Sequence, residues 1–96
     1  MSKKGIYTIV LDYKGGTYIA QVTAHSPVAA LPKWASKIKG EALSEWGITR
    51  DELAKIIKSD HVIPVDGCVN VWCTSGSTHG GLALVNVIAT AESPEA

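Results

Sequence analysis

Residues 6–24 read IYTIVLDYKGGTYIAQVTA and decide the fold, because two alternating segments flank a pair of adjacent glycines. Apolar and polar residues alternate in both segments with the period of two that is typical of half-buried strands. Both central residues of a type I′ turn take positive φ, which glycine adopts without steric cost. The segment therefore predicts a β-hairpin that turns at Gly15 and Gly16, with Leu11 opposite Ala20 on the core face.

The middle of the chain predicts two helices. Ser26 and Pro27 are typical of a helix start, with serine as the N-cap and proline at the first helical position. Pro32 would remove one backbone donor inside this helix, so either the helix kinks there or regular helix begins just before it. Thr49 and Glu52 have the spacing of a capping box and predict the start of a second helix.

The last third of the chain returns to the strand pattern. Residues 61–65, HVIPV, are short and contain a proline, which favours an edge position. Residues 68–75 and 82–90 alternate as two longer strands, and residues 41–47 could add one helical turn before the second helix. The order β-β-α-α-β-β predicts an α+β fold, in which two helices pack on one face of an antiparallel sheet of about four strands.

Length and composition limit the classes of protein to consider. The 96 residues predict a single domain over residues 1–91, followed by a disordered tail over residues 92–96. The formal net charge is zero, which makes a nucleic-acid partner unlikely on electrostatic grounds. No apolar run approaches the roughly 18 residues of a membrane-spanning helix, and the start has no signal-peptide pattern. We expect a cytoplasmic protein without a membrane partner, whose two cysteines are reduced thiols.

Residues 71–83, VWCTSGSTHGGLA, hold the side chains that look most like chemistry. Cys73 and His79 could form a thiol–imidazole pair, which is the basis of an alternative function as a small thiol-dependent or small-molecule enzyme. Cys68 and Cys73 are five positions apart, so they point to opposite faces of a regular strand and do not favour a shared metal ion. The stretch is better explained as a hairpin turn rich in glycine and serine, and no catalytic residue, metal or cofactor is expected.

The last hairpin offers a candidate binding surface. A turn centred near Thr78 places Asn70 opposite Asn86 and Trp72 opposite Leu84 on one face of the hairpin. Such a mixed face suits an interface, with apolar area for affinity and amides for register, unless a helix or a short strand covers it. The other face of the same hairpin is wholly apolar and would belong to the core. We expect a non-catalytic protein-interaction or regulatory module that acts as a homodimer, with a further protein partner as an option.

Residues 5–22, GIYTIVLDYKGGTYIAQV, resemble in outline the strand-turn-strand start of HicB-type antitoxin domains, which also lead into a helix. The likeness covers about a fifth of the chain and depends mostly on generic hairpin chemistry. The Pro-Gly-Cys stretch that such domains carry after the second strand is replaced here by His25, Ser26 and Pro27, and no C-terminal DNA-binding element follows. The resemblance favours partner binding over catalysis.

Overall fold

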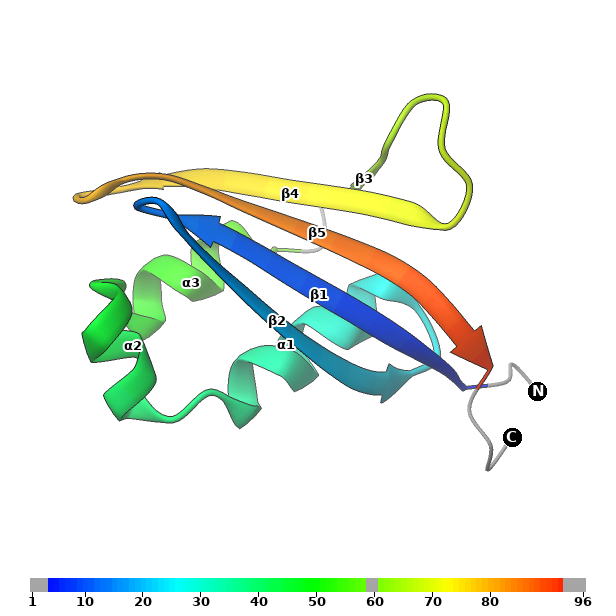
Figure 1. The fold of residues 1–96 in the computed structure, drawn as a ribbon, viewed down its shortest axis with the longest axis horizontal. Coiled ribbons are helices and arrows are strands. Elements are labelled where there is room, and N and C mark those ends of the chain that lie inside the picture. Colours follow the sequence, from blue (N-terminus) through cyan, green and yellow to red (C-terminus); the bar gives the residue numbers. More distant parts are fainter. Residues whose placement is uncertain (1–3, 59–60, 93–96) are drawn as a thin grey trace.

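A computed structural model of the chain describes residues 4–58 and 61–92, which form five strands and three helices in one α+β unit (Figure 1). In chain order these elements are β1 (Gly5–Tyr13), β2 (Gly16–Ala24), α1 (Pro27–Lys37), α2 (Gly40–Trp46), α3 (Arg50–Ile56), β3 (Ile63–Pro64), β4 (Val71–Thr78) and β5 (Gly81–Glu92). All strand pairs are antiparallel, and the strand order across the sheet is β2-β1-β5-β4-β3.

The predicted α+β class with an antiparallel sheet is confirmed, and the element count differs in two places. The proline-containing segment adds the two-residue strand β3, and residues 40–46 form the separate helix α2. Strand β5 continues to Glu92, the first residue of the predicted tail, and the rest of that tail, residues 93–96, lies outside the described residues.

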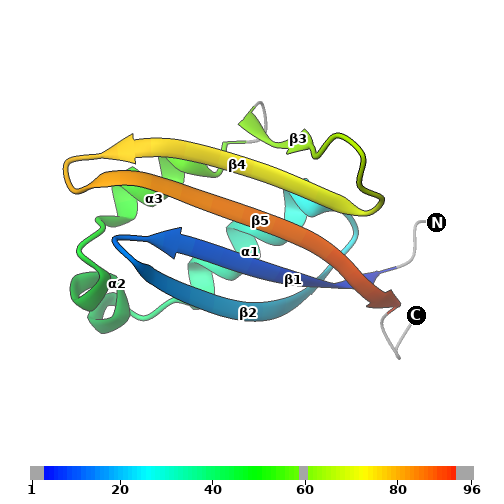
Figure 2. The same cartoon turned by 45° about the horizontal axis from the view of Figure 1, so that its top comes forward.

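Helices α1, α2 and α3 lie on one side of the sheet, and Figure 2 shows the strands in front with the helices behind them. The core forms between the two layers. Ile9, Leu11 and Val85 from the central strands are fully buried, as are Leu31 and Leu53 from the helices. The opposite side of the sheet has no helical layer in the part of the chain that the structure describes.

The helix starts follow their sequence signals. The hydroxyl of Ser26 accepts a hydrogen bond from the backbone N–H of Ala29 at 3.0 Å, as an N-cap residue does. Pro32 lies inside α1 at an exposed position, and the helix runs from Pro27 to Lys37, so regular helix does not wait for Leu31.

Both long hairpins have a two-residue turn whose second residue is glycine, and in both a further glycine follows the turn. In the first hairpin Lys14 and Gly15 are the turn residues, with φ of 50° and 78°, and Tyr13 pairs with Gly16. The predicted turn at Gly15 and Gly16 is therefore wrong by one position, and the register is shifted by two residues, with Leu11 opposite Tyr18. A shift of two keeps every side chain on its expected face.

The second glycine of the first hairpin provides room rather than positive φ. A Cβ atom on Gly16 would lie 2.9 Å from Cζ of Tyr18, so only glycine lets the Tyr18 ring fold back over this position. The ring stacks on Trp46 of α2, with centroids 4.3 Å apart and planes inclined by 26°. The stack therefore places the Tyr18 ring over Gly16, the strand residue that directly follows the turn.

In the second hairpin the turn residues are His79 and Gly80, and Thr78 pairs with Gly81. The predicted turn centred near Thr78 is wrong, and the register differs by three residues, which moves every β4 side chain to the other face. Contacts with α3 fix the observed turn. The carboxylate of Glu52 accepts a hydrogen bond from the His79 backbone N–H at 2.9 Å and another from its ring Nδ1–H at 3.0 Å.

Helix α3 is capped at its start and bound to β4 at its end. At its start, Thr49 and Glu52 form the predicted capping box, with both reciprocal hydrogen bonds present. At its end, the buried hydroxyl of Thr74 donates a hydrogen bond to the carbonyl oxygen of Ile56 at 2.6 Å. A Cβ atom on Gly76 would lie 2.9 Å from Cγ1 of Ile56, so glycine is what allows this close approach of helix and strand.

Candidate functional site

The four residues predicted to form one binding face do not share a face. Leu84 and Asn86 point away from the helices, opposite Ser75 and Cys73 of β4. Trp72 is opposite the buried Val87 and points toward the core, where its ring lies 6.4 Å from that of Tyr7. Asn70 precedes β4 in an exposed position with φ of 63°. The predicted β4–β5 register puts Trp72 and Leu84 on the same face, whereas the observed register, shifted by three residues, puts them on opposite faces.

The uncovered side of the sheet has an apolar middle. One row of directly opposed residues crosses all five strands and consists of Ile19, Val10, Asn86, Cys73 and Ile63. Further apolar residues adjoin this row on β5 and β4, namely Leu84, Ile88 and Val71. We call these eight residues the open face. Ile19 is 67% exposed and Ile63 is 56% exposed.

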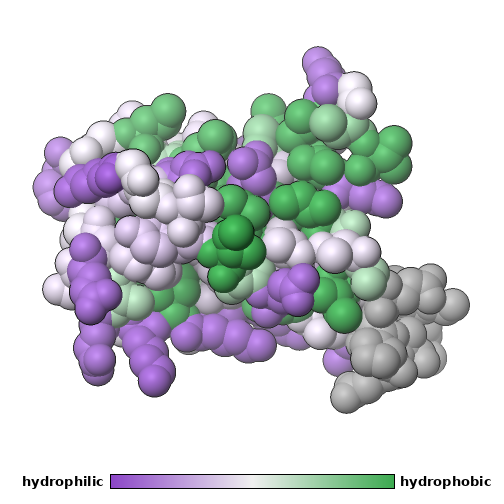
Figure 3. All heavy atoms as spheres, viewed as in Figure 1, coloured by the Kyte–Doolittle hydropathy of each residue, from purple (hydrophilic) through white to green (hydrophobic). Residues whose placement is uncertain are grey.

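The surface of the molecule reflects this arrangement. Figure 3 shows hydrophobic residues gathered in the middle of the view, over the strands, and again around the loop that joins β3 to β4 at the upper right. Monomeric proteins rarely expose contiguous apolar patches larger than a few hundred Å², and larger patches mark interaction sites. The open face therefore has the character of a contact surface.

Polar pairs border the open face on the β1–β2 side. The hydroxyl of Thr17 donates to Oδ1 of Asp12 at 2.8 Å, and Nε2 of Gln21 donates to Oγ1 of Thr8 at 3.0 Å. Asp12 is the only charged residue among the described outward-facing side chains of β1, β2, β4 and β5. An apolar centre depleted of charge with a polar border is the usual composition of a protein interface.

Asn86 lies at the middle of the open face, on the central strand β5. It stands opposite Val10 on one side and Cys73 on the other. Its side-chain amide has no hydrogen-bond partner among the described residues, and it is half-buried. An amide offers both donors and an acceptor, so it can pair with an identical amide of a second molecule.

Cys73 and His79, the pair considered for thiol chemistry, are not brought together. The Cys73 side chain lies on the open face, six residues before His79, which corresponds to about 20 Å along a strand. The His79 ring is instead engaged with Glu52 at the start of α3. The hydrogen bonds from Thr49 and His79 lower the pKa of the Glu52 carboxyl from 4.5 to about 2. The contact between His79 and Glu52 therefore has a structural role, because it binds the β4–β5 turn to α3.

The described residues contain no group of three or more histidine, cysteine, aspartate or glutamate side chains that could hold a metal ion. Cys68 is exposed and Cys73 is half-buried, and both are free thiols. Within the described ranges, the helices are all too short and too polar to cross a membrane.

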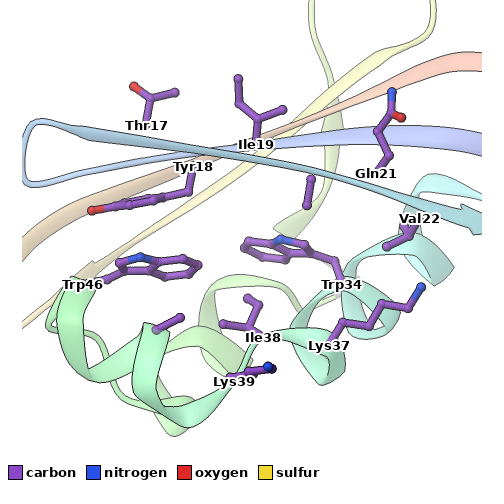
Figure 4. Close-up of a pocket in the computed structure, with 12 residues that line it drawn as sticks. Thr17, Tyr18, Ile19, Gln21, Val22, Trp34, Lys37, Ile38, Lys39 and Trp46 are labelled. Atoms are coloured by element: carbon purple, nitrogen blue, oxygen red, sulfur yellow. The ribbon is translucent and has the colours of Figure 1, made fainter.

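A second surface feature was missed by sequence reasoning. A pocket of about 590 Å³ opens between β2 and the helices α1 and α2 (Figure 4). Its aromatic lining comes from Tyr18, Trp34 and Trp46, and Lys37 and Lys39 stand at its border. The available signal was the pattern of aromatic residues: the chain has no phenylalanine, and two of its three tryptophans fall on the two helices that line this pocket.

Fold and surface together define an α+β domain with an open-faced antiparallel sheet. No family model matches the chain, and no curated protein or solved structure shows significant similarity to it. The resemblance of residues 5–22 to HicB-type domains is therefore limited to its strand-turn-strand outline.

Proposed function

We propose that this chain is a non-catalytic protein-interaction module and that it acts as a homodimer, in which two copies pack open face against open face. The observation that carries the proposal is a sheet face that no helix of the described residues covers, with an apolar middle and, at its centre, the Asn86 amide, which no described residue hydrogen-bonds. Two sheets that pack face to face interdigitate their inner side chains at a separation of about 10 Å.

Charge supports a second copy as the occupant. A symmetric interface brings each residue near its own equivalent, so a charged face repels itself. Among the described outward-facing side chains of β1, β2, β4 and β5, Asp12 is the only charged one, and it lies at the border of the open face, where Thr17 donates to it. Self-association therefore costs little electrostatic repulsion.

Asn86 supports the same occupant by its chemistry. A twofold axis through the middle of the face would bring the two Asn86 amides together. Each amide could then donate to the carbonyl oxygen of the other, and this pair would fix the register of the two sheets. A partner that offers only apolar side chains would leave the amide desolvated and unpaired, at a cost of about 1–3 kcal/mol.

The size of the sheet is compatible with a dimer interface. The four long strands and β3 carry about 18 outward-facing residues, close to the 20–30 residues that each partner of a standard interface contributes. With a strand spacing of about 4.8 Å and a repeat of about 6.7 Å, these residues cover about 580 Å² of flat sheet. Side-chain relief raises the accessible area toward the order of 800 Å² per partner.

The alternative function, a thiol-dependent enzyme using Cys73 and His79, is less well supported because the two side chains are far apart along β4. A thiol on the open face between Ile63 and Asn86 has no adjacent base among its opposed residues, so it fits a contact surface better than a nucleophile. The cytoplasmic location expected from the sequence stays a prediction.

The test is the solution mass of the wild-type protein and of Asn86→Asp, measured by light scattering across a dilution series. The substitution preserves shape but places two carboxylates at the centre of the interface. Like charges that face each other across an interface cost several kcal/mol, so the dissociation constant should rise by about 100-fold or more. Circular dichroism checks that both proteins are folded.

Val28→Lys is the matched control, because Val28 is a 40% exposed apolar residue on α1, on the helical side of the sheet. A dimeric wild type and control with a folded, monomeric Asn86→Asp would support the proposal. A wild type that stays monomeric at the highest concentration would overturn the homodimer. An Asn86→Asp protein as dimeric as the wild type would show that another surface mediates self-association.

A further inference from the structure

Strand β2 is one edge of the sheet, and no described strand pairs with the outer side of its middle. Edge strands are commonly blunted by lysine, proline, a bulge or very short length. The opposite edge follows this rule, since it ends in the two-residue strand β3 with Pro64. In contrast, β2 is nine residues long. The residues of its middle whose backbone groups face the free edge are Thr17, Ile19 and Gln21, and none of them is lysine or proline.

The register of the first hairpin determines which backbone groups of β2 are free. In an antiparallel pair, alternate residues direct both their N–H and C=O groups to the partner strand. Tyr13 and Gly16 flank the two-residue turn and form such a pair, so Tyr18 and Ala20 also bond to β1. The N–H and C=O groups of the intervening residues therefore point away from the sheet.

The carbonyl group of Thr23 confirms this direction, because it accepts a hydrogen bond from Nζ of Lys33 on α1 at 2.9 Å. Lys33 thus satisfies the last outward carbonyl of β2. The three outward residues before it have no such cover from described side chains on their backbone groups. The N–H and C=O groups of these three residues could therefore hydrogen-bond to one more antiparallel strand.

The pocket between β2, α1 and α2 lies directly beside this edge. Figure 4 shows the rings of Tyr18, Trp34 and Trp46 on the helical side of β2, with Ile38 below them. Trp34 is almost fully buried, and Trp46 and Tyr18 are half-buried and stacked on each other. An added strand would send alternate side chains to this side of the sheet, where the pocket of about 590 Å³ can receive a large apolar one.

The charges near the pocket favour an acidic ligand. Lys37 and Lys39 line the pocket and are exposed, and in the described part of the chain neither ammonium group has an ion-pair partner. Glu41 and Glu45 of α2 are exposed and are not among the residues that line the pocket. The same charges oppose pairing of two β2 strands from two copies, since Lys37 and Lys39 would then approach their own equivalents.

We propose that the β2 edge binds an extended peptide segment as an additional antiparallel strand, with a large apolar side chain in the Tyr18–Trp34–Trp46 pocket and acidic residues next to Lys37 and Lys39. This second surface adjoins the open face at Ile19, whose side chain belongs to the open face and whose outward backbone groups belong to the edge. Main-chain hydrogen bonds to residues 17, 19 and 21 would supply general affinity, and the pocket and the lysines would supply specificity.

The test uses a capped nine-residue peptide of alternating threonine and leucine with an aspartate at each end, and its binding is followed by amide NMR on the full chain. Strand addition has its own signature. The amide hydrogens of Thr17, Ile19 and Gln21 should become protected from solvent exchange on binding, whereas those of Tyr18 and Ala20 are already bonded to β1.

Two controls separate the parts of the proposal. A peptide of the same sequence with N-methyl groups on the residues that face β2 cannot form the main-chain bonds and should not bind. A peptide with lysine at each end should bind about fivefold more weakly, as expected for two exposed ion pairs. The double variant Lys37→Glu and Lys39→Glu should reverse this preference, whereas Lys55→Glu on α3 should leave it unchanged.

Several outcomes would overturn the proposal. One is binding of the N-methylated peptide with equal affinity, because the edge would then not be used. Another is binding of a single-stranded oligonucleotide but not of the acidic peptide, which would identify the lysines and aromatic rings as a nucleic-acid site. Concentration-dependent protection of Thr17, Ile19 and Gln21 in the protein alone would show that a second copy occupies the edge.

Discussion

The two hairpins of this protein share one turn motif, yet they differ in what fixes their register. Both turn at X-Gly before a second glycine, Lys14-Gly15 in one and His79-Gly80 in the other. In the first hairpin the turn residues take positive φ, so local backbone chemistry explains the turn. In the second, neither turn residue has positive φ, and the turn depends on contacts with Glu52 of α3.

The difference shows how far an error in register matters. A two-residue error in the first hairpin changes the opposed partners and leaves the core unchanged. A three-residue error in the second sends Trp72 and Thr74 to solvent and Cys73 to the core, because strand faces alternate with a period of two. A register error of an even number of residues keeps each side chain on its face of the sheet, whereas an error of an odd number moves each side chain to the other face.

The largest expected effect is at Gly76, where β4 lies against α3. Gly76→Val places side-chain atoms where a Cβ atom alone would already be 2.9 Å from Cγ1 of Ile56. We expect a loss of about 3 kcal/mol or more in the free energy of unfolding, because the helix must move away from the strand. Urea denaturation measures it. A loss below about 0.5 kcal/mol, typical of exposed surface substitutions, would mean that Gly76 faces solvent.

The next effect distinguishes the two faces of β4 directly. Thr74→Val removes the hydroxyl that donates to the buried Ile56 carbonyl, so the free energy of unfolding should fall by about 2 kcal/mol. Ser75→Val, one position along on the exposed face, should change it by less than about 0.5 kcal/mol. Denaturant unfolding of both variants decides the register, because a three-residue slip would exchange the two results.

A smaller effect depends on pH. The folded-state pKa of Glu52 is about 2, below its ordinary value of 4.5, so its contribution to stability is present above pH 4.5 and is lost as the pH falls toward 2. Glu52→Gln should therefore be less stable than the wild type at neutral pH and equally stable near pH 2. Thermal unfolding across this range measures the difference.

Glu41→Gln is the control for the pH effect, since Glu41 is exposed on α2 and accepts no hydrogen bond from the described residues. At neutral pH, Glu41→Gln should lose much less stability than Glu52→Gln. A Glu52→Gln protein that follows the wild type throughout would contradict the role of Glu52 in holding the second turn.

The smallest effect compares the two turns by one substitution. Lys14→Asn should stabilise the first hairpin by about 0.5 kcal/mol, because asparagine tolerates the positive φ of this position better than lysine. His79→Asn should instead destabilise the second by a similar amount, about 0.5–1 kcal/mol, since the ring contact with Glu52 is lost. Equal signs in thermal melts would mean that both turns are set by local backbone preference alone.

Elements with a local cause could be predicted from the sequence. The capping box at Thr49 and the serine cap at Ser26 satisfy their own helix ends, and both appear as expected. The first hairpin could be predicted because the glycines indicate a turn at the point where the two alternating segments meet. Helix α2 was indicated only as an extra turn, and it ends at Gly47 with φ of 77°.

The candidate site could be predicted only in part. Leu84 and Asn86 are on the uncovered side of the sheet, as the sequence indicated, because their strand alternates regularly. The position of Trp72 depends on how β4 aligns with β5, and that alignment is set by Glu52, which is 27 positions from His79. The β2 pocket depends on two helices that meet an edge strand, a contact that no local pattern specifies.

The position of β1 between β2 and β5 also bears on how the chain reaches this structure. The first hairpin joins near neighbours, whereas the adjacent β1–β5 ladder joins residues as distant as Gly5 and Glu92, 87 positions apart. Closing such a long loop costs entropy before any contact compensates for it, and it slows folding. A nascent chain would hold β1 with one side unpaired until β5 emerges. A chain that lacks β5 therefore exposes unpaired edges of both β1 and β4, which makes it prone to aggregate.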